Sequence, residues 1–182
     1  MKVINGELAG MRLIEPDVFG DARGFFTELW NAGRYRAHGI EAGFVQDNLS
    51  RSKRGTLRGL HFQHPTPQGK LVTVLEGEVF DVAVDLRRGS PTFGRWEGVR
   101  LSSENRRQLY VPEGFAHGFQ VLSESALFYY KCTAPYAANH ERAVRWDDPD
   151  LGIAWPLPDP VLSAKDAAAP RLRDLPADHL FP

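Results

Sequence analysis

Short strand-like runs separated by turn residues are the feature that most constrains the fold of this chain. Glycine, proline, asparagine and aspartate cluster between the runs, as they do where strands end. The runs cover residues 8–15, 24–30, 44–50, 56–62, 71–75, 79–86, 94–101, 108–111, 115–122 and 127–133. Helical pattern is confined to residues 31–38 and to a turn at 164–169, ended by Pro170. About ten short strands at this spacing predict an all-β barrel or sandwich with few short helices.

The chain has the size and composition of one globular domain. Its 182 residues are 42% hydrophobic and 25% charged, which is ordinary for a soluble protein with a substantial core. We find no internal repeat and no linker, so we expect a single domain over residues 1–182. The proline-rich segment from Pro156 onward is predicted to be a tail that wraps this domain.

Charge and cysteine content exclude several classes of function. A formal net charge of −1 gives no bulk electrostatic reason to bind nucleic acid or an anionic membrane. The one cysteine, Cys132, excludes an internal disulfide and a zinc site built from several cysteines. No signal-like or membrane-length apolar segment occurs, so we expect a cytoplasmic protein.

Strand phase directs several polar side chains toward the interior. Successive side chains of a strand point to opposite faces, so residues two apart share a face. His117 thereby shares its face with Phe115 and Phe119. The other polar side chains in phase with apolar neighbours are Gln46, Asn48, Lys70 and Tyr130. Buried polar groups are costly unless they are paired or line a ligand cavity, so these residues indicate a binding site.

The run 79–86 shows the clearest alternation. One face carries Phe80, Val82, Val84 and Leu86, and the other carries Asp81 and Asp85. This pattern is typical of a β-strand.

A possible metal site is suggested by Pro112, Gly114 and His117, which fit the Pro-x-Gly-x-x-His mark of cupin barrels. Metal-binding cupins also offer a nearby pair of histidines and a carboxylate. Here His61 and His64 have two residues between them, which sends them to opposite faces of a strand. The next ionisable residue is Lys70, whose ammonium group repels a cation. The sequence therefore predicts no metal site.

Without a metal, an inward histidine, lysine and tyrosine suit proton abstraction beside a carbonyl group. A neutral imidazole is a base near neutral pH, and an ammonium group stabilises the developing enolate. A phenol on the opposite side can return a proton and invert the carbon. The chain has no Gly-x-Ser-x-Gly, Walker A or Gly-x-Gly-x-x-Gly pattern, which disfavours acyl transfer, nucleotide hydrolysis and dinucleotide redox chemistry.

Seven stretches of the chain carry a resemblance to a known family. They are residues 19–26, 44–48, 57–62, 68–72, 77–85, 112–119 and 162–166. In order and spacing they resemble the dTDP-4-dehydrorhamnose 3,5-epimerases of the bacterial dTDP-L-rhamnose pathway. The resemblance implies a jelly-roll cupin fold, a homodimer with exchanged N-terminal strands, and no metal or organic cofactor. It implies conversion of dTDP-4-dehydro-6-deoxy-D-glucose to dTDP-4-dehydro-L-rhamnose.

The resemblance also implies a role for individual residues. His61 would be the base at C3 and C5, oriented by Asp166, while Lys70 stabilises the enolate and Tyr130 is the opposite acid. The substrate-binding residues would be Arg23, Glu28, Gln46, Asp47, Asn48, Arg58, His117, Glu141 and Lys165. Taken without the resemblance, Glu28, Glu141, Lys165 and Asp166 would be predicted to be solvated surface charges.

Two of these residues conflict with simple strand phase. Alternation puts Arg58 and His61 on opposite faces, so a β-bulge or a ligand that contacts both is required. Asp47 is out of phase with its neighbours Gln46 and Asn48.

Other functions remain open on the sequence. The same motifs would serve an epimerase that inverts only C3 or only C5, or a ketoisomerase that moves the carbonyl from C4 to C3. A metal-dependent cupin, or a cupin that only binds a nucleotide sugar, is a further alternative.

Overall fold

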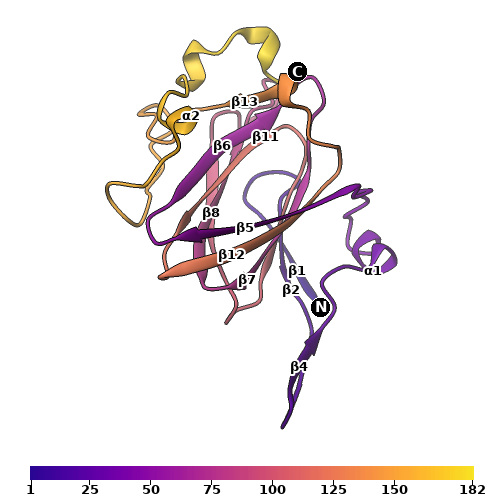
Figure 1. The fold of residues 1–182 in the computed structure, drawn as a ribbon. Helices are drawn as coiled ribbons and strands as arrows, with labels where there is room; N and C mark the ends of the chain where they lie inside the picture. Colours follow the sequence, from indigo (N-terminus) through magenta and orange to yellow (C-terminus); the bar gives the residue numbers. More distant parts are fainter.

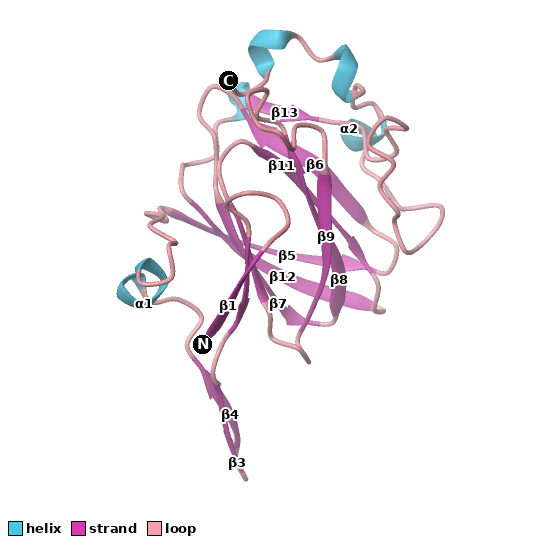
Figure 2. Ribbon diagram, turned by 180° about the vertical axis from the view of Figure 1, so that it is seen from behind, coloured by secondary structure: helices cyan, strands magenta, loops and turns pink.

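A computed structural model describes residues 1–182 and shows two β-sheets that enclose a core (Figures 1 and 2). The strand order is β1-β2-β10-β7-β12-β5 in the six-stranded sheet and β13-β6-β11-β8-β9 in the five-stranded sheet. All named strand pairs are antiparallel. The predicted all-β, cupin-type architecture is confirmed.

The elements have the following bounds. The six-stranded sheet contains β1 (Lys2–Asn5), β2 (Arg12–Glu15), β10 (Gln108–Val111), β7 (Lys70–Glu76), β12 (Ser125–Cys132) and β5 (Gln46–Lys53). The five-stranded sheet contains β13 (Glu141–Ala143), β6 (Leu57–Gln63), β11 (Phe115–Val121), β8 (Glu78–Asp85) and β9 (Trp96–Ser102). A separate hairpin contains β3 (Val18–Asp21) and β4 (Gly24–Thr27). The helices are α1 (Ala32–Arg36), α2 (Ala164–Ala167) and three 3₁₀ turns: η1 (Ala138–His140), η2 (Leu172–Asp174) and η3 (Ala177–His179).

Every predicted run contains or overlaps one of these strands, and both predicted helical segments form helix. The helices begin where side chains cap them: Asn31 accepts from the backbone N–H of Arg34, and Ser163 accepts from that of Asp166. The prediction missed β1, β3 and β13. Each has four residues or fewer, which is too short for alternation to stand out.

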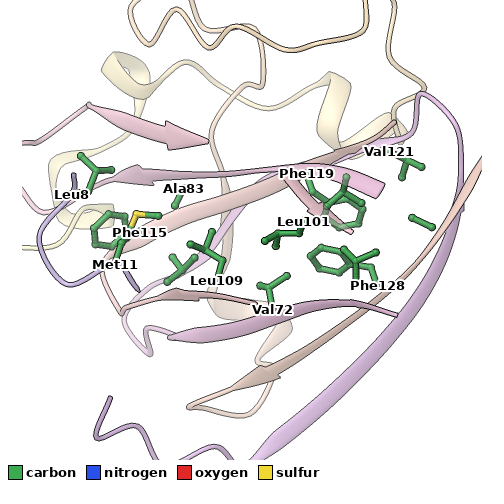
Figure 3. Packing of buried hydrophobic residues seen from close by; sticks show 14 residues of the cluster. Leu8, Met11, Val72, Ala83, Leu101, Leu109, Phe115, Phe119, Val121 and Phe128 are labelled. Atoms are coloured by element: carbon green, nitrogen blue, oxygen red, sulfur yellow. The ribbon is translucent and has the colours of Figure 1, made fainter. Parts of the chain in front are cut away.

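Apolar side chains from both sheets meet in the interior between them (Figure 3). This main core consists of Leu8, Met11, Val72, Val74, Val79, Ala83, Leu101, Leu109, Val111, Phe115, Phe119, Val121, Ala126 and Phe128. Its members recur at every second position of β7, β11 and β12, as the strand phase predicted. Tyr130 packs against the same core.

A second core lies on the outer side of the five-stranded sheet, under the C-terminal tail. Leu172, Leu180 and Phe181 of the tail pack there against side chains of β6, β8 and β11. The apolar face of β8, which begins with Phe80, belongs to this second core. The predicted wrapping tail is thereby confirmed. Because the tail covers that face, the alternate side chains Asp81 and Asp85 point into the interior between the sheets.

The β3–β4 hairpin projects away from the two sheets (Figure 1). Its aromatic side chains Phe19, Phe25 and Phe26 are exposed, although large apolar side chains usually find cover. The following helix α1 instead packs its buried Tyr35 against Ile14 and Leu71 of the six-stranded sheet. None of the helices is long and apolar enough to cross a membrane.

Candidate active site

Polar side chains from both sheets converge around His61. His61 lies on β6 of one sheet, while Lys70 and Tyr130 lie on β7 and β12 of the other. Three adjoining hollows of about 210, 300 and 150 Å³ all have His61 in their walls. Lys70 and Tyr130 line two of these hollows. Together the hollows form a concave polar cleft of the kind that binds small-molecule ligands.

An imidazole–carboxylate pair stands at the centre of the cleft. His61 Nε2 lies 2.5 Å from Asp166 Oδ1, and the two side chains are 31% and 4% exposed. Burial acts to raise the pKa of Asp166 and is the largest single influence, but the hydrogen bond and charge of His61, together with Ser163 and Lys165, outweigh it and the pKa is lowered. Asp166 is therefore an ionised acceptor, so Nε2 carries the proton and the other ring nitrogen keeps its lone pair.

Asp166 reaches this position through the local structure of the tail. It lies in the first turn of α2, where its N–H donates to the Ser163 side chain at 3.1 Å. Helix α2 lies against β6. A residue 105 positions away in the chain thereby orients the His61 ring.

Lys70 brings a cation into the cleft without a counter-ion. Its side chain is 8% exposed, and no carboxylate lies within ion-pair distance of its ammonium group. Burial lowers the pKa of Lys70, and the nearby Cys132, Asp81 and Glu141 oppose that shift. An unpaired buried cation is costly, so this site favours a ligand that develops negative charge.

Tyr130 brings a phenol to the same hollow. Its ring centroid lies 5.8 Å from that of Phe128, which is part of the main core. Burial raises the pKa of Tyr130, and Arg58 only partly opposes the shift. The phenol therefore stays protonated near neutral pH and can act as an acid.

A bulge in β6 explains how Arg58 and His61 face the same cleft. His61 is paired with His117 on β11, whereas Arg58 is paired with Phe119, so β6 has one extra residue between the two pairs. Both side chains line the same hollows. The predicted bulge is confirmed. It depends on Gly59, which has φ +125° and where a Cβ atom would lie 2.6 Å from the Gly118 Cα.

Charged and amide side chains form the rim of the cleft. The Lys165 ammonium contacts the carboxylate of Glu141, which also accepts a 2.6 Å hydrogen bond from the Tyr136 hydroxyl. Gln46 accepts from the Tyr136 N–H at 2.7 Å and donates to Asn48 at 3.0 Å. Thus Gln46, Asn48, Glu141 and Lys165, all expected from the sequence, lie together.

Three predicted site residues lie elsewhere in this chain. Arg23 is on the tip of the hairpin, where it pairs with Asp21, and Glu28 lies 3.2 Å from Arg34. Asp47 forms a 2.6 Å ion pair with Lys131, whose side chain alternation places on the opposite face to Tyr130. None of the three lines a hollow that contains His61.

The sequence reasoning missed Tyr136 and Asp81 as neighbours of the site. Tyr136 lies in a loop, where no strand phase could indicate its direction. Asp81 accepts a 2.8 Å hydrogen bond from His117 Nε2 inside the barrel. Its inward direction could have been inferred only by recognising that the apolar face of β8 is covered by the tail.

The predicted separation of His61 from His64 is also observed. The His64 ring packs on Phe181 of the tail, with 5.3 Å between ring centroids, while His61 faces the cleft. No group of three or more histidine, cysteine, aspartate or glutamate side chains could hold a metal ion.

Comparison with known proteins gives one consistent result. Residues 5–174 match the family described as dTDP-4-dehydrorhamnose 3,5-epimerase. The chain is 59% identical over 168 residues to the enzyme of that name from Pseudomonas aeruginosa, covering 91% of this chain and 93% of the relative. It is 52% identical to that from Methanothermobacter thermautotrophicus over 178 residues, covering 96% of both proteins.

A solved structure agrees with this result. The crystal structure of dTDP-6-deoxy-D-glucose-3,5-epimerase from Legionella pneumophila, in complex with dTDP-4-keto-L-rhamnose, superposes with a TM-score of 0.96. The sequences are 55% identical, and the match covers 99% of this chain and 97% of that one.

The cupin-type barrel and its acid–base cleft define a carbohydrate epimerase, an enzyme of the isomerase class. The chain belongs to the dTDP-4-dehydrorhamnose 3,5-epimerase family.

Proposed function

We propose that this protein inverts C3 and C5 of dTDP-4-dehydro-6-deoxy-D-glucose to give dTDP-4-dehydro-L-rhamnose. The observation that carries the proposal is the arrangement of the His61–Asp166 pair, the unpaired Lys70 and the protonated Tyr130 around one cleft. These groups are a base, a cation and an acid, which are the parts that inversion beside a carbonyl requires. The reaction is also the one in the names of the relatives.

Proton removal falls to His61. The hydrogens at C3 and C5 are acidic because both carbons flank the C4 carbonyl. The free nitrogen of His61 takes one of them, and the ring becomes an imidazolium that the Asp166 carboxylate stabilises at 2.5 Å.

The electrons left behind form an enolate with its negative charge on O4. Lys70 is a buried cation of the cleft with no carboxylate in ion-pair contact, so the enolate oxygen can form a direct ion pair with its ammonium group. The interaction exists only once charge develops, so it lowers the barrier rather than tightening ground-state binding.

Tyr130 returns a proton to the opposite face of the same carbon. The enolate collapses to the ketone with the carbon inverted. The phenolate then regains a proton and the imidazolium loses one, both by exchange with solvent, which resets the site for the second carbon. Only protons move, so the proposed reaction needs no redox cofactor.

Arg58 and Lys165, at the cleft, are proposed to hold the diphosphate of the substrate. Gln46, Asn48, His117 and Glu141 would complete its binding from the surrounding walls. We further propose that the enzyme acts in the cytoplasm.

A homodimer with exchanged N-terminal strands would explain the residues that lie outside the cleft. The projecting hairpin has exposed phenylalanines and carries Arg23, with Glu28 directly after it. In an exchanged dimer this hairpin reaches the second protomer, so each site would receive Arg23 and Glu28 from its partner. The phenylalanines would be covered at the same time.

Hybrid dimers test the exchange. Arg23→Ala and His61→Ala protomers, each inactive alone, are mixed by joint unfolding and refolding. If Arg23 acts on the partner's site, half of the dimers are hybrids with one intact site, and about a quarter of wild-type activity returns. No recovery, or a monomeric species in sedimentation, would exclude the exchange.

Turnover in D₂O tests the reaction. The proposed mechanism places solvent deuterium at both C3 and C5 of the product, which NMR resolves. Deuterium at one carbon only would show a mono-epimerase, and a carbonyl at C3 would show a ketoisomerase. Stoichiometric metal in the purified protein, with activity lost on chelation, would establish the metal-dependent alternative.

A further inference from the structure

A second buried carboxylate lies beneath the cleft, at Asp81 on β8. Its side chain is fully buried, and Oδ1 accepts a 2.8 Å hydrogen bond from His117 Nε2. Its other oxygen, Oδ2, has no hydrogen-bond partner. A buried carboxylate oxygen without a donor is costly, so its presence calls for an explanation.

Asp85, four residues along the same face of β8, shows what a structural carboxylate looks like in this fold. It is also fully buried, but its oxygens accept from Arg87 Nε at 2.9 Å and from Ser90 and Thr92 at 2.6 Å each. Asp85 therefore ties together the turn after β8. Asp81, by contrast, accepts a hydrogen bond from one donor only, His117, and does not stabilise a turn.

Lys70 is the group in the cleft that lacks a counter-charge. The titratable or charged groups around it are His61 of β6, Asp81 of β8, His117 of β11, Tyr130 and Cys132 of β12, Arg58 of β6 and Glu141 of β13. Of these, the groups that favour its charged form are Cys132, Asp81 and Glu141.

Two of these three groups are not available as a negative counter-charge for Lys70. Burial raises the pKa of the Cys132 thiol, which therefore stays neutral near pH 7. The Glu141 carboxylate is already in contact with the Lys165 ammonium and accepts from the Tyr136 hydroxyl. Asp81 is left, with one unpaired oxygen and no cation in contact.

We propose that Asp81 is the buried counter-charge of this site, a positioning residue that keeps Lys70 protonated and holds the His117 ring through the Asp81–His117 hydrogen bond. His117 is the cross-strand partner of His61 and lines the hollow with Lys70 and Tyr130. Because a carboxylate only accepts, His117 Nε2 carries the proton and Nδ1 remains an acceptor for a sugar hydroxyl. The hydroxyl contact rests on the proposed function, whereas the charge on Lys70 does not.

The test compares Asp81→Asn with Asp85→Asn in the full-length protein. Lysine labelled with ¹⁵N at Nζ allows the Lys70 ammonium to be titrated by NMR without substrate. In Asp81→Asn the titration should move to lower pH by about one unit, the shift typical of losing one nearby opposite charge. In Asp85→Asn it should stay in place, while the unfolding temperature falls by about 5 °C or more as several hydrogen bonds to a charged group are lost.

The turnover rate of Asp81→Asn is the second measurement. At neutral pH, Asp81→Asn should lower the rate about 10- to 100-fold, the usual cost of removing a group that orients an imidazole. Its unfolding temperature should stay close to that of the wild type, because Asp81 accepts a single hydrogen bond and the amide oxygen of asparagine can still accept it from His117.

An unchanged Lys70 titration in Asp81→Asn, or an equal shift in Asp85→Asn, would overturn the proposal. If Asp81→Asn does not fold, the Lys70 titration is measured in Glu141→Gln instead. A shift to lower pH by one unit or more would identify Glu141 as the counter-charge and overturn the proposal. An unchanged titration supports Asp81. A wild-type enzyme that places no deuterium at C3 or C5 would contradict the proposed function alone, since the titration needs no substrate.

Discussion

The site contains two imidazole–carboxylate pairs that differ in their exposure to solvent. In the pair at the cleft, His61 is 31% exposed and its carboxylate comes from the C-terminal tail. In the deep pair, His117 is 6% exposed and Asp81 belongs to a central strand. The nitrogen–oxygen distances are 2.5 and 2.8 Å. The same two groups can therefore serve as a proton carrier or as a fixed charge, depending on their access to water.

Burial decides which role each pair takes. It lowers the pKa of His117, and the attraction of Asp81 does not fully restore it. The His117 ring is therefore held neutral and is poorly placed to accept a proton during turnover. His61, open to the cleft, can exchange protons with substrate and solvent, so we assign the base to the exposed pair.

The largest expected effect comes from removing the exposed imidazole. His61→Ala should abolish deuterium exchange and inversion together, because no enolate can form, with a loss of at least about 10²–10⁴-fold. His117→Gln, which changes the deep pair, should retain exchange clearly above the His61→Ala level. Mass spectrometry of recovered substrate measures the exchange. Equal loss in both variants would remove the distinction between the pairs.

Replacing the acid should separate exchange from inversion. In Tyr130→Phe, His61 can still remove and return a proton on its own face, while net inversion should fall about 100-fold or more. Exchange into recovered substrate, followed by mass spectrometry, should therefore outlast inversion, followed by NMR. If both vanish equally in a folded variant, Tyr130 helps to form the enolate and its assigned role is wrong.

The fall of the deuterium exchange rate at alkaline pH should follow the deprotonation of Lys70. Burial lowers its pKa from the ordinary 10.5 and raises that of Tyr130, and both shifts favour titration of the ammonium group before the phenol. The exchange rate should fall about tenfold per pH unit above the lowered Lys70 pKa. Tyr130→Phe should still catalyse some deuterium exchange. The rate of that exchange should fall at the same alkaline pH as in the wild type. If the fall disappears in that variant, it would be assigned to the phenol.

The smallest expected effect is on stability in acid. The folded-state pKa of Asp166 lies below its ordinary value of 3.8, so the ionised carboxylate stabilises the fold above that value. This contribution is lost as pH falls through the folded-state pKa. Asp166→Asn should therefore unfold on the order of 5 °C below the wild type at neutral pH.

In strong acid the unfolding temperatures of Asp166→Asn and the wild type should converge. Calorimetry across pH measures the difference. A difference that stays constant with pH would show that the charge of Asp166 contributes nothing to the fold.

The inward polar residues could be predicted because strand phase is a local property. Lys70, His117 and Tyr130 all face the interior as alternation required. The Arg58–His61 conflict was also informative, since it pointed to the bulge at Gly59.

Contacts that depend on the tail could not be predicted from local pattern. Asp166 meets His61 only after the tail folds back over the five-stranded sheet, and the resemblance to a family was its only sequence signal. The same tail covers the apolar face of β8 and so turns Asp81 inward. Arg23 and Glu28 are a different case, because no contact within one chain brings them to the cleft.

The complete site also depends on the C-terminal tail as well as on the two sheets. The two sheets supply the cleft, Lys70 and Tyr130, but the carboxylate that contacts the proposed base, His61, is in α2. A molecule with folded sheets and an undocked tail would therefore possess a binding site without a properly partnered base. Under the proposed mechanism, catalysis therefore requires the tail to be folded against the sheets, so that Asp166 contacts His61.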